Sequence, residues 1–134
     1  MREILFRGKD VDRKEWVYGG YSLYPHTRFP CAPTVYEVDE GCWHPVEVIP
    51  GTVGQYTGLN DKNGRKIFEG DIVRHYNDER MPETYDIGCI IFNTCECMFR
   101  RTSVGRNDSF AIAKHCLYEV IGNIHDNPEL MKGE

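Results

Sequence analysis

Glycine and proline interrupt this chain so often that long helices have little room to form. The sequence holds 13 Gly and 7 Pro, and only two long stretches, 89–104 and 106–121, are free of both. β-Branched and aromatic residues dominate between the breaks, and turn-forming residues recur at short intervals. This pattern predicts an all-β fold built from short hairpins.

Alternating apolar residues predict where the strands lie. The first hairpin is expected to join 3–7 to 16–24 through a polar turn. Further strands are expected at 34–38, 46–49, 53–59, 86–93, 97–102 and 118–124. The segment 109–117 fits a strand or a helix by its period, and we favour a strand. After the last strand, Asp126 or Asn127 is expected to cap a helical segment of one or two turns.

Length and composition bound the class of protein. A chain of 134 residues has the length of one domain or of two very small ones, and we expect a single domain over 1–134 with its own hydrophobic core. No stretch approaches the ~20 apolar residues that a membrane span needs. The start of the chain carries charges on both sides of a short apolar run, unlike a secretory signal, so we expect a cytoplasmic location.

The chain is acidic, with a formal net charge of −5 and a pI near 5.5. A protein dedicated to duplex binding usually carries a basic surface that releases counterions from phosphates. Three arginines form the candidate nucleic-acid edge: Arg100, Arg101 and Arg106. We favour the interpretation that these arginines are solvated strand ends, so nucleic acid is the less favoured partner.

The six cysteines have spacings that bear on metal binding. They occur at 31, 42, 89, 95, 97 and 116. The closest pairs, Cys95-x-Cys97 and Cys42-x-His44, are one residue shorter than the knuckle that zinc prefers. In a strand this spacing places both side chains on one face, which Cys89 would share. We expect free, reduced thiols, with metal ligation and disulfides as the alternatives.

Motifs that carry catalysis are missing from the sequence. It lacks G-x-S-x-G, H-E-x-x-H and a phosphate-binding glycine loop. An EF-hand loop set on Gly64 fails because Leu59 and Gly70 fall where carboxylates are required. The sequence therefore predicts no enzyme activity, no cofactor and no metal site, although histidines converging in a pocket would revive the enzyme hypothesis.

Four polar residues form a candidate polar turn cluster: Asp61, Asn63, Glu69 and Asp71. Asn63-Gly64 is expected to supply the two positive-φ positions of a tight hairpin turn. Asp and Asn in turns hydrogen-bond their own backbone, and we favour this structural interpretation. The alternative is a ligand or cation site, because hard cations prefer oxygen ligands. Three glycines are expected where a Cβ would be penalised: Gly58, Gly64 and Gly70.

Aromatic residues gather in and beside the proline-rich loop that follows the first hairpin. Because aromatic residues are enriched at binding hot spots, the segment 21–45 is the candidate interaction surface. Its expected contact residues are Tyr21, Tyr24, Phe29 and Trp43. The alternative is that these rings belong to an ordinary core.

Three sequence blocks together resemble a known family. They are REI-x-FR at 2–7, GQYTGL-x-D-x-NG-x₃-FEGDIV at 54–73, and EVIGNI-x₂-NPEL at 119–130. These blocks resemble the YopX family, small proteins carried by bacteriophages and prophages. The resemblance implies a compact SH3-like β-barrel, a tendency to form homo-oligomers, a bacterial host cell and no established biochemical activity. It is weakest over 75–117, where the cysteines concentrate.

We therefore expect a non-catalytic binding or assembly module that self-associates and contacts a protein partner, without a membrane partner. The alternative is a nucleic-acid-binding accessory protein that uses the arginine edge, with aromatic rings stacking on bases. A small enzyme is the least favoured hypothesis, because no catalytic motif supports it.

Overall fold

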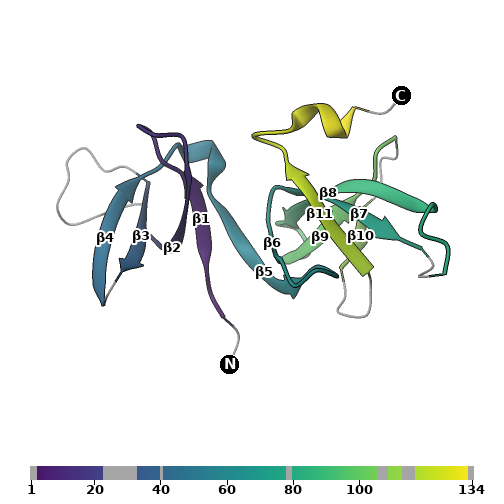
Figure 1. Ribbon diagram of the computed structural model, residues 1–134, viewed down its shortest axis with the longest axis horizontal. Coiled ribbons are helices and arrows are strands. Elements are labelled where there is room, and N and C mark those ends of the chain that lie inside the picture. Colours follow the sequence, from purple (N-terminus) through teal and green to yellow (C-terminus); the bar gives the residue numbers. More distant parts are fainter. Residues whose placement is uncertain are drawn as a thin grey trace. The chain divides into compact units, whose positions relative to one another are not determined.

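A computed structural model describes residues 3–22, 33–39, 41–77, 80–105, 109–112 and 117–132 (Figure 1). Strands dominate these residues, as the sequence predicted. The strands are β1 (Phe6–Lys9), β2 (Trp16–Ser22), β3 (Thr34–Asp39), β4 (Cys42–Glu47), β5 (Gly54–Asn60), β6 (Lys66–Phe68), β7 (Asp71–Tyr76), β8 (Tyr85–Asn93), β9 (Met98–Thr102), β10 (Ser109–Ala111) and β11 (Leu117–Asn123). Two short 3-10 segments complete the fold: η1 (Pro50–Thr52) and η2 (Pro128–Met131).

The strands form two antiparallel sheets, with the orders β4-β3-β2-β1-β5-β6 and β10-β9-β8-β7-β11. The chain separates into two compact units, Met1–Tyr56 (unit 1) and Thr57–Glu134 (unit 2), and the division falls inside β5. The single domain expected over 1–134 stays a prediction. Neither sheet closes into a barrel within the described residues, so the SH3-like barrel implied by the family resemblance also stays a prediction.

A small valine core holds unit 1 together. Val17, Val35 and Val48 are almost completely buried, and Tyr21 and Val46 pack against them. The expected first hairpin is confirmed, because β1 pairs with β2 in antiparallel register. Its first strand begins and ends later than expected, because β1 runs from Phe6 to Lys9 instead of from residue 3 to residue 7.

Pro45 lies inside β4, although we expected a strand that begins only at residue 46. The N–H of Val48 donates to the carbonyl of Pro33 at 3.0 Å, and donors along an antiparallel strand alternate between its two sides. Pro45, three residues earlier, therefore directs its missing N–H away from β3. Because β4 is the last strand of its sheet, this proline removes no ladder bond and makes the free edge harder to pair.

A larger apolar core holds unit 2 together. Its buried members come from β6, β7, β8 and β11: Ile67, Val73, Ile90, Tyr118 and Val120. The strand β7 is central to this core because it pairs with both β8 and β11. The ambiguous segment 109–117 begins with a strand, β10, as we expected, and residues 113–116 lie outside the described residues.

Each unit bends one long strand at a glycine. The first part of β2 pairs with β1 and its last part with β3, while β8 divides its pairing between β7 and β9. A Cβ at Gly19 would lie 1.9 Å from the carbonyl oxygen of Tyr36, and one at Gly88 would lie 1.7 Å from that of Thr102. Glycine is therefore required at both bends because a neighbouring backbone comes too close for a side chain.

The turns follow the sequence expectation in part. Gly58, Gly64 and Gly70 have φ values of 91°, 83° and 92°, which confirms the expectation that a Cβ would be penalised there. The expectation that Asn63 also has a positive φ is wrong. The N–H of Asp61 donates to the carbonyl of Arg65, so the loop is longer than a two-residue turn and needs only one left-handed position.

The expected helical segment at the C-terminal end is present as η2, which follows β11 (Figure 1). The expected side-chain cap is wrong, because the side chain of Asn127 makes no capping bond to η2. Its Oδ1 instead accepts the N–H of Asn123 at 3.3 Å, which ties the turn back to β11. Within the described parts of the chain, no helix is long and apolar enough to cross a membrane.

Replacing Gly88 by alanine is expected to destabilise unit 2 by about 3 kcal/mol, because the new Cβ forces β8 and β9 apart. Urea unfolding followed by intrinsic fluorescence measures the loss. The control is Gly51→Ala, since no atom lies within 4 Å of a Cβ at that position. Equal unfolding midpoints for the two variants would contradict the close approach at Gly88.

Candidate functional site

Three large apolar side chains lie exposed on one face of β2, β3 and β4. Trp43 is 66% exposed, Val38 is 55% exposed and Tyr18 is 46% exposed. Val38 and Trp43 are cross-strand partners, and alternation along β2 and β3 places Tyr18 and Tyr36 on the same side. We call these four residues the aromatic face. Gly20 lies on this face beside Trp43, since a Cβ there would be in van der Waals contact with the ring at 4.0 Å.

Two basic side chains of β1, Arg7 and Lys9, lie on the same side of the sheet as the aromatic face. The guanidinium of Arg7 lies 4.5 Å from the centre of the Trp16 ring, and the ammonium of Lys9 lies 5.7 Å from it. Such cation–π contacts hold a positive charge beside an aromatic surface. Arg7 is only 4% exposed, so the half-buried Lys9 is the cation that borders the exposed rings.

The structure does not place the residues of the expected interaction surface together. Trp43 is exposed on the aromatic face. Tyr21 lies on the opposite side of β2, where it packs against the valine core with its ring centre 5.5 Å from that of Phe6. Tyr24 and Phe29 lie outside the described residues. Of the four expected contact residues, the structure therefore places only Trp43 on a described surface.

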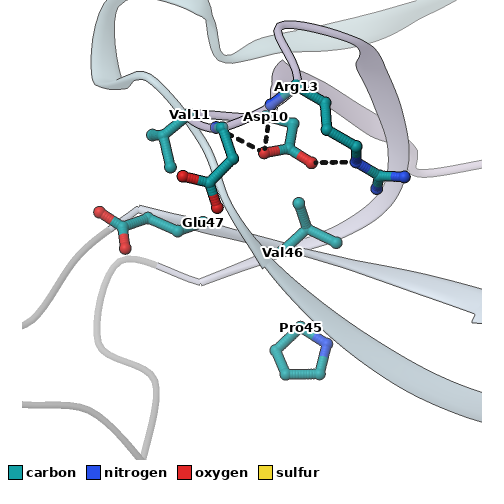
Figure 2. A pocket seen from close by; sticks show the side chains of 7 residues that line it. Asp10, Val11, Arg13, Pro45, Val46 and Glu47 are labelled. Atoms are coloured by element: carbon teal, nitrogen blue, oxygen red, sulfur yellow. Dashed lines mark hydrogen bonds and ion pairs between the residues drawn. The ribbon is translucent and has the colours of Figure 1, made fainter.

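A pocket of about 490 Å³ lies between the β1–β2 turn and β4 (Figure 2). Its lining residues are Asp10, Val11, Asp12, Arg13, Pro45, Val46 and Glu47. Oδ1 of Asp10 accepts the N–H of Asp12 at 2.8 Å, and Oδ2 accepts Nε of Arg13 at 3.1 Å. The Asp12 N–H, helped by Arg13 and opposed by burial, holds the pKa of Asp10 below its ordinary value. The Asp10 carboxylate is thus committed to its own turn.

Asp61 of the candidate polar turn cluster is buried and binds backbone. Its Oδ1 accepts the N–H groups of Asn63 at 2.9 Å and Arg65 at 2.8 Å. Its Oδ2 accepts the N–H of Val120 on β11 at 3.0 Å. One carboxylate therefore joins the β5–β6 turn to the last strand of unit 2.

Asp71 of the same cluster acts on a different turn. It is almost completely buried, and its Oδ2 accepts the N–H of Phe68 at 2.7 Å. Asn63 is exposed and Glu69 is half-buried. Among the described residues, no three His, Cys, Asp or Glu side chains gather in a way that could hold a metal ion. The geometry of Asp61 and Asp71 thus favours turn formation over a ligand site.

The candidate nucleic-acid edge is not a row of free cations. Arg101 is only 4% exposed, and its guanidinium lies 4.9 Å from the centre of the Phe110 ring. Arg100 points to the other side of β9, where it bonds Ser109 and Glu96. Arg106 lies outside the described residues. Neither described arginine is therefore available as part of a phosphate track.

None of the cysteines in the described parts of the chain forms a disulfide bond. Cys42, Cys95 and Cys97 are exposed and Cys89 is buried, while residues 31 and 116 lie outside the described residues. The expectation that Cys95 and Cys97 share a strand face with Cys89 is wrong. Both lie in the turn between β8 and β9, and Cys97 has a φ of 55° there.

A second group of side chains crosses the outer face of unit 2. We call it the basic-aromatic cluster, and its members are Lys62, Arg74, Tyr76, Tyr85 and Glu119. Oε1 of Glu119 accepts Nη1 of Arg74 at 3.2 Å and the hydroxyl of Tyr76 at 2.8 Å. The ammonium of Lys62 lies 4.4 Å from the Tyr76 ring centre, and the Arg74 guanidinium lies 5.0 Å from that of Tyr85. Each cation therefore rests on a tyrosine.

The surroundings of Glu119 and Arg74 in this cluster favour the charged form of each side chain. The Tyr76 hydroxyl, aided by Lys62 and Arg74 and opposed by burial, holds the pKa of Glu119 below its ordinary value. Burial disfavours the charge of Arg74, but hydrogen bonding to Tyr76 and Glu119 outweighs it and raises the pKa of Arg74. The carboxylate of Glu119 therefore anchors the Arg74 guanidinium and fixes a positive charge on this face.

Sequence reasoning missed this cluster because its members come from separate elements. Arg74 faces Glu119 across β7 and β11, and Tyr76 faces Tyr85 across β7 and β8. The available signal was the alternation of Arg74 with Tyr76 on one side of β7. The partners of these residues depend on strand register, which the sequence does not encode locally.

A buried polar pair lies on the opposite side of the same sheet. Nδ1 of His75 and Nε of Arg101 are buried, and neither has a hydrogen-bond partner among the described residues. The His75 ring lies 5.2 Å from that of Tyr118, and its cross-strand partner on β8 is Asp86. Burial first, and then the charge of Arg101, lower the pKa of His75, while Asp86 opposes the shift.

Removing the Asp61 carboxylate is expected to destabilise unit 2. Asp61→Ala leaves the buried N–H of Val120 without its acceptor and removes two bonds from the turn, for a loss of about 3 kcal/mol. Asp61→Asn keeps one acceptor oxygen and is expected to lose less. Urea unfolding measures both, with Asn63→Ala as a control that keeps the backbone donor. A loss for Asn63→Ala as large as for Asp61→Ala would contradict this role.

Unit 2 is expected to lose stability as the pH falls below about 6.5, the ordinary pKa of histidine. Above that pH, His75 is neutral in both the folded and the unfolded state. Below it, the unfolded chain binds the proton more readily because the folded pKa is lowered, so the free energy of unfolding decreases. Urea midpoints between pH 7.5 and 5 should fall less in His75→Gln than in the wild type, and His44→Gln, which changes an exposed histidine, should behave like the wild type. An unchanged pH slope in His75→Gln would contradict this assignment.

Comparison with known proteins agrees with the sequence blocks. The family model described as YopX protein matches residues 5–132. The crystal structure of protein EF1440 from Enterococcus faecalis is similar, with a TM-score of 0.58 and 22% identity over 98% of this chain and 100% of that chain. This likeness concerns the fold alone, and no curated protein matches the chain. Because the family match spans nearly the whole sequence, the chain belongs to the YopX family.

Proposed function

We propose that this protein is a non-catalytic binding module and that its aromatic face contacts a protein partner. The observation that carries the proposal is the exposure of Trp43, Val38 and Tyr18 together on one side of β2, β3 and β4. Clustered exposed apolar side chains mark interaction surfaces, and Trp and Tyr are enriched among the residues that dominate binding energy.

The same face is the proposed route of self-association. Pairing through the edge of β4 is disfavoured because Pro45 offers no donor there and the carbonyl of Glu47 already accepts the N–H of Val11. A face-to-face contact needs no free strand edge. We further propose that the protein acts in the cytoplasm of a bacterial host and comes from a bacteriophage or prophage, as the family resemblance implies.

A non-catalytic role is supported by what the buried acids do. Asp10, Asp61 and Asp71 direct their carboxylates to backbone N–H groups of their own turns. Groups bound in this way stabilise the fold and are poorly placed to move a proton to a substrate.

The first measurement is a tagged pull-down from lysate of a bacterial host, run with and without nuclease, together with the solution mass by light scattering. Trp43→Ser is expected to weaken partner capture or self-association by about tenfold or more, as removal of a hot-spot ring does. Its folding should change by less than about 0.5 kcal/mol because the side chain is largely exposed.

The matched control is Met81→Ser, which removes an exposed apolar side chain in unit 2. It should leave capture and mass unchanged. A strict monomer that captures no protein would contradict the proposal. Capture that disappears after nuclease treatment would replace it with the nucleic-acid alternative.

A further inference from the structure

The basic-aromatic cluster of unit 2 has more hydrogen-bond donors than acceptors left to offer. Glu119 uses Oε1 for both Arg74 and Tyr76. No salt bridge or hydrogen bond among the described residues holds the ammonium of Lys62, which lies over the Tyr76 ring. The three ammonium donors of Lys62 and Nη2 of Arg74 therefore face only one uncommitted carboxylate oxygen, Oε2 of Glu119.

The charges of the cluster leave one positive charge in excess. Two cations, Lys62 and Arg74, share a single carboxylate, that of Glu119, whose pKa the Tyr76 hydroxyl lowers with the help of both cations. The guanidinium of Arg74 is fixed by Glu119 on one side and by the Tyr85 ring on the other. A preordered cation loses less entropy when it meets an anion, so the cluster is prepared for an oxyanion.

Apolar side chains border the same face. Ile87 is the cross-strand partner of Arg74, and Leu117 is the partner of Tyr76. Both are half-buried, and Tyr85 is 40% exposed. Directly opposed residues on paired strands lie on one face, so the oxyanion site has apolar and aromatic walls.

We propose that the basic-aromatic cluster binds a carboxylate carried by an acidic segment of a protein partner, with an apolar residue beside the acid. Complementarity of charge selects the carboxylate, and Ile87, Leu117 and Tyr85 receive the apolar neighbour. A nucleic-acid backbone fits this site less well than a single carboxylate. Its successive phosphates would also come close to the negatively charged Glu119, whereas one carboxylate needs only Lys62 and Arg74. The site shares no residue with the aromatic face of the proposed function, which belongs to unit 1.

The proposal is tested with a labelled synthetic peptide of glutamate, tyrosine and leucine residues and with its glutamine counterpart, by fluorescence anisotropy on the full chain. The glutamate peptide should bind and the glutamine peptide should not. Binding should weaken as salt is added, because exposed ion pairs are screened. Lys62→Met should weaken binding by about fivefold, the size of one surface ion pair, and Lys62→Arg should restore it.

Two further variants separate binding from folding. Glu119→Gln keeps an acceptor for Tyr76 and removes the negative charge, so the glutamate peptide should bind more tightly, which damage to the fold would not produce. Lys132→Met, outside the cluster, is the charge-matched control and should bind like the wild type. Trp43→Ser should also bind normally, so the failure of the aromatic face and the failure of this site are distinguishable.

Equal binding of the two peptides, or an unchanged affinity in Lys62→Met, would overturn the proposal. Tighter binding of oligothymidylate than of the glutamate peptide, lost in Lys62→Met, would also overturn it and assign the cluster to nucleic acid.

Discussion

The carboxylate of Asp61 is the interaction on which the arrangement of unit 2 most depends. It accepts two N–H groups from its own turn and a third from Val120, 59 residues further along the chain. The next residue, Lys62, donates its backbone N–H to the carbonyl of Tyr118 at 2.9 Å. The turn is thereby fixed against β11, and this is what carries the Lys62 ammonium over the Tyr76 ring. The turn residue Asp61 thus helps to position Lys62, a member of the basic-aromatic cluster.

A second constraint is the close approach of a neighbouring backbone to a long strand, and in both units a glycine allows this approach. A long strand changes partner part-way along its length, and a glycine occupies the bend, Gly19 in β2 and Gly88 in β8. Such bends let a few short strands wrap around a small core without long connections. The bend in β8 also divides its pairing, so Tyr85 and Ile87 join β7 while the later residues join β9.

Local chemistry in the sequence was sufficient to predict the β class, most of the strands, the glycine turns and a short helical segment near the C-terminal end, because each depends on neighbours in the chain. It was insufficient where the answer depends on a partner strand. Pro45 ends a strand by propensity, yet it is accepted in β4 because its missing N–H faces the free edge. Tyr21 was expected on a strand and at a contact surface, yet its position in β2 directs the ring into the valine core. Of the predicted surface residues, Trp43 is exposed because its position in β4 turns it outward.

Two pairs of basic residues in unit 2 show why adjacency in sequence is a poor guide to a binding site. Arg100 and Arg101 are neighbours in β9, so their side chains leave opposite sides of the strand, and one is buried while the other is bound by Ser109 and Glu96. Lys62 and Arg74 are twelve positions apart, yet both rest on tyrosine rings beside one carboxylate. Basic residues of an acidic β protein can therefore contribute to one binding site only where the fold places them on the same face. A chain with a net negative charge can attract an acidic segment only through a local excess of positive charge. The position of that excess, and not the net charge of the chain, then determines where the segment binds.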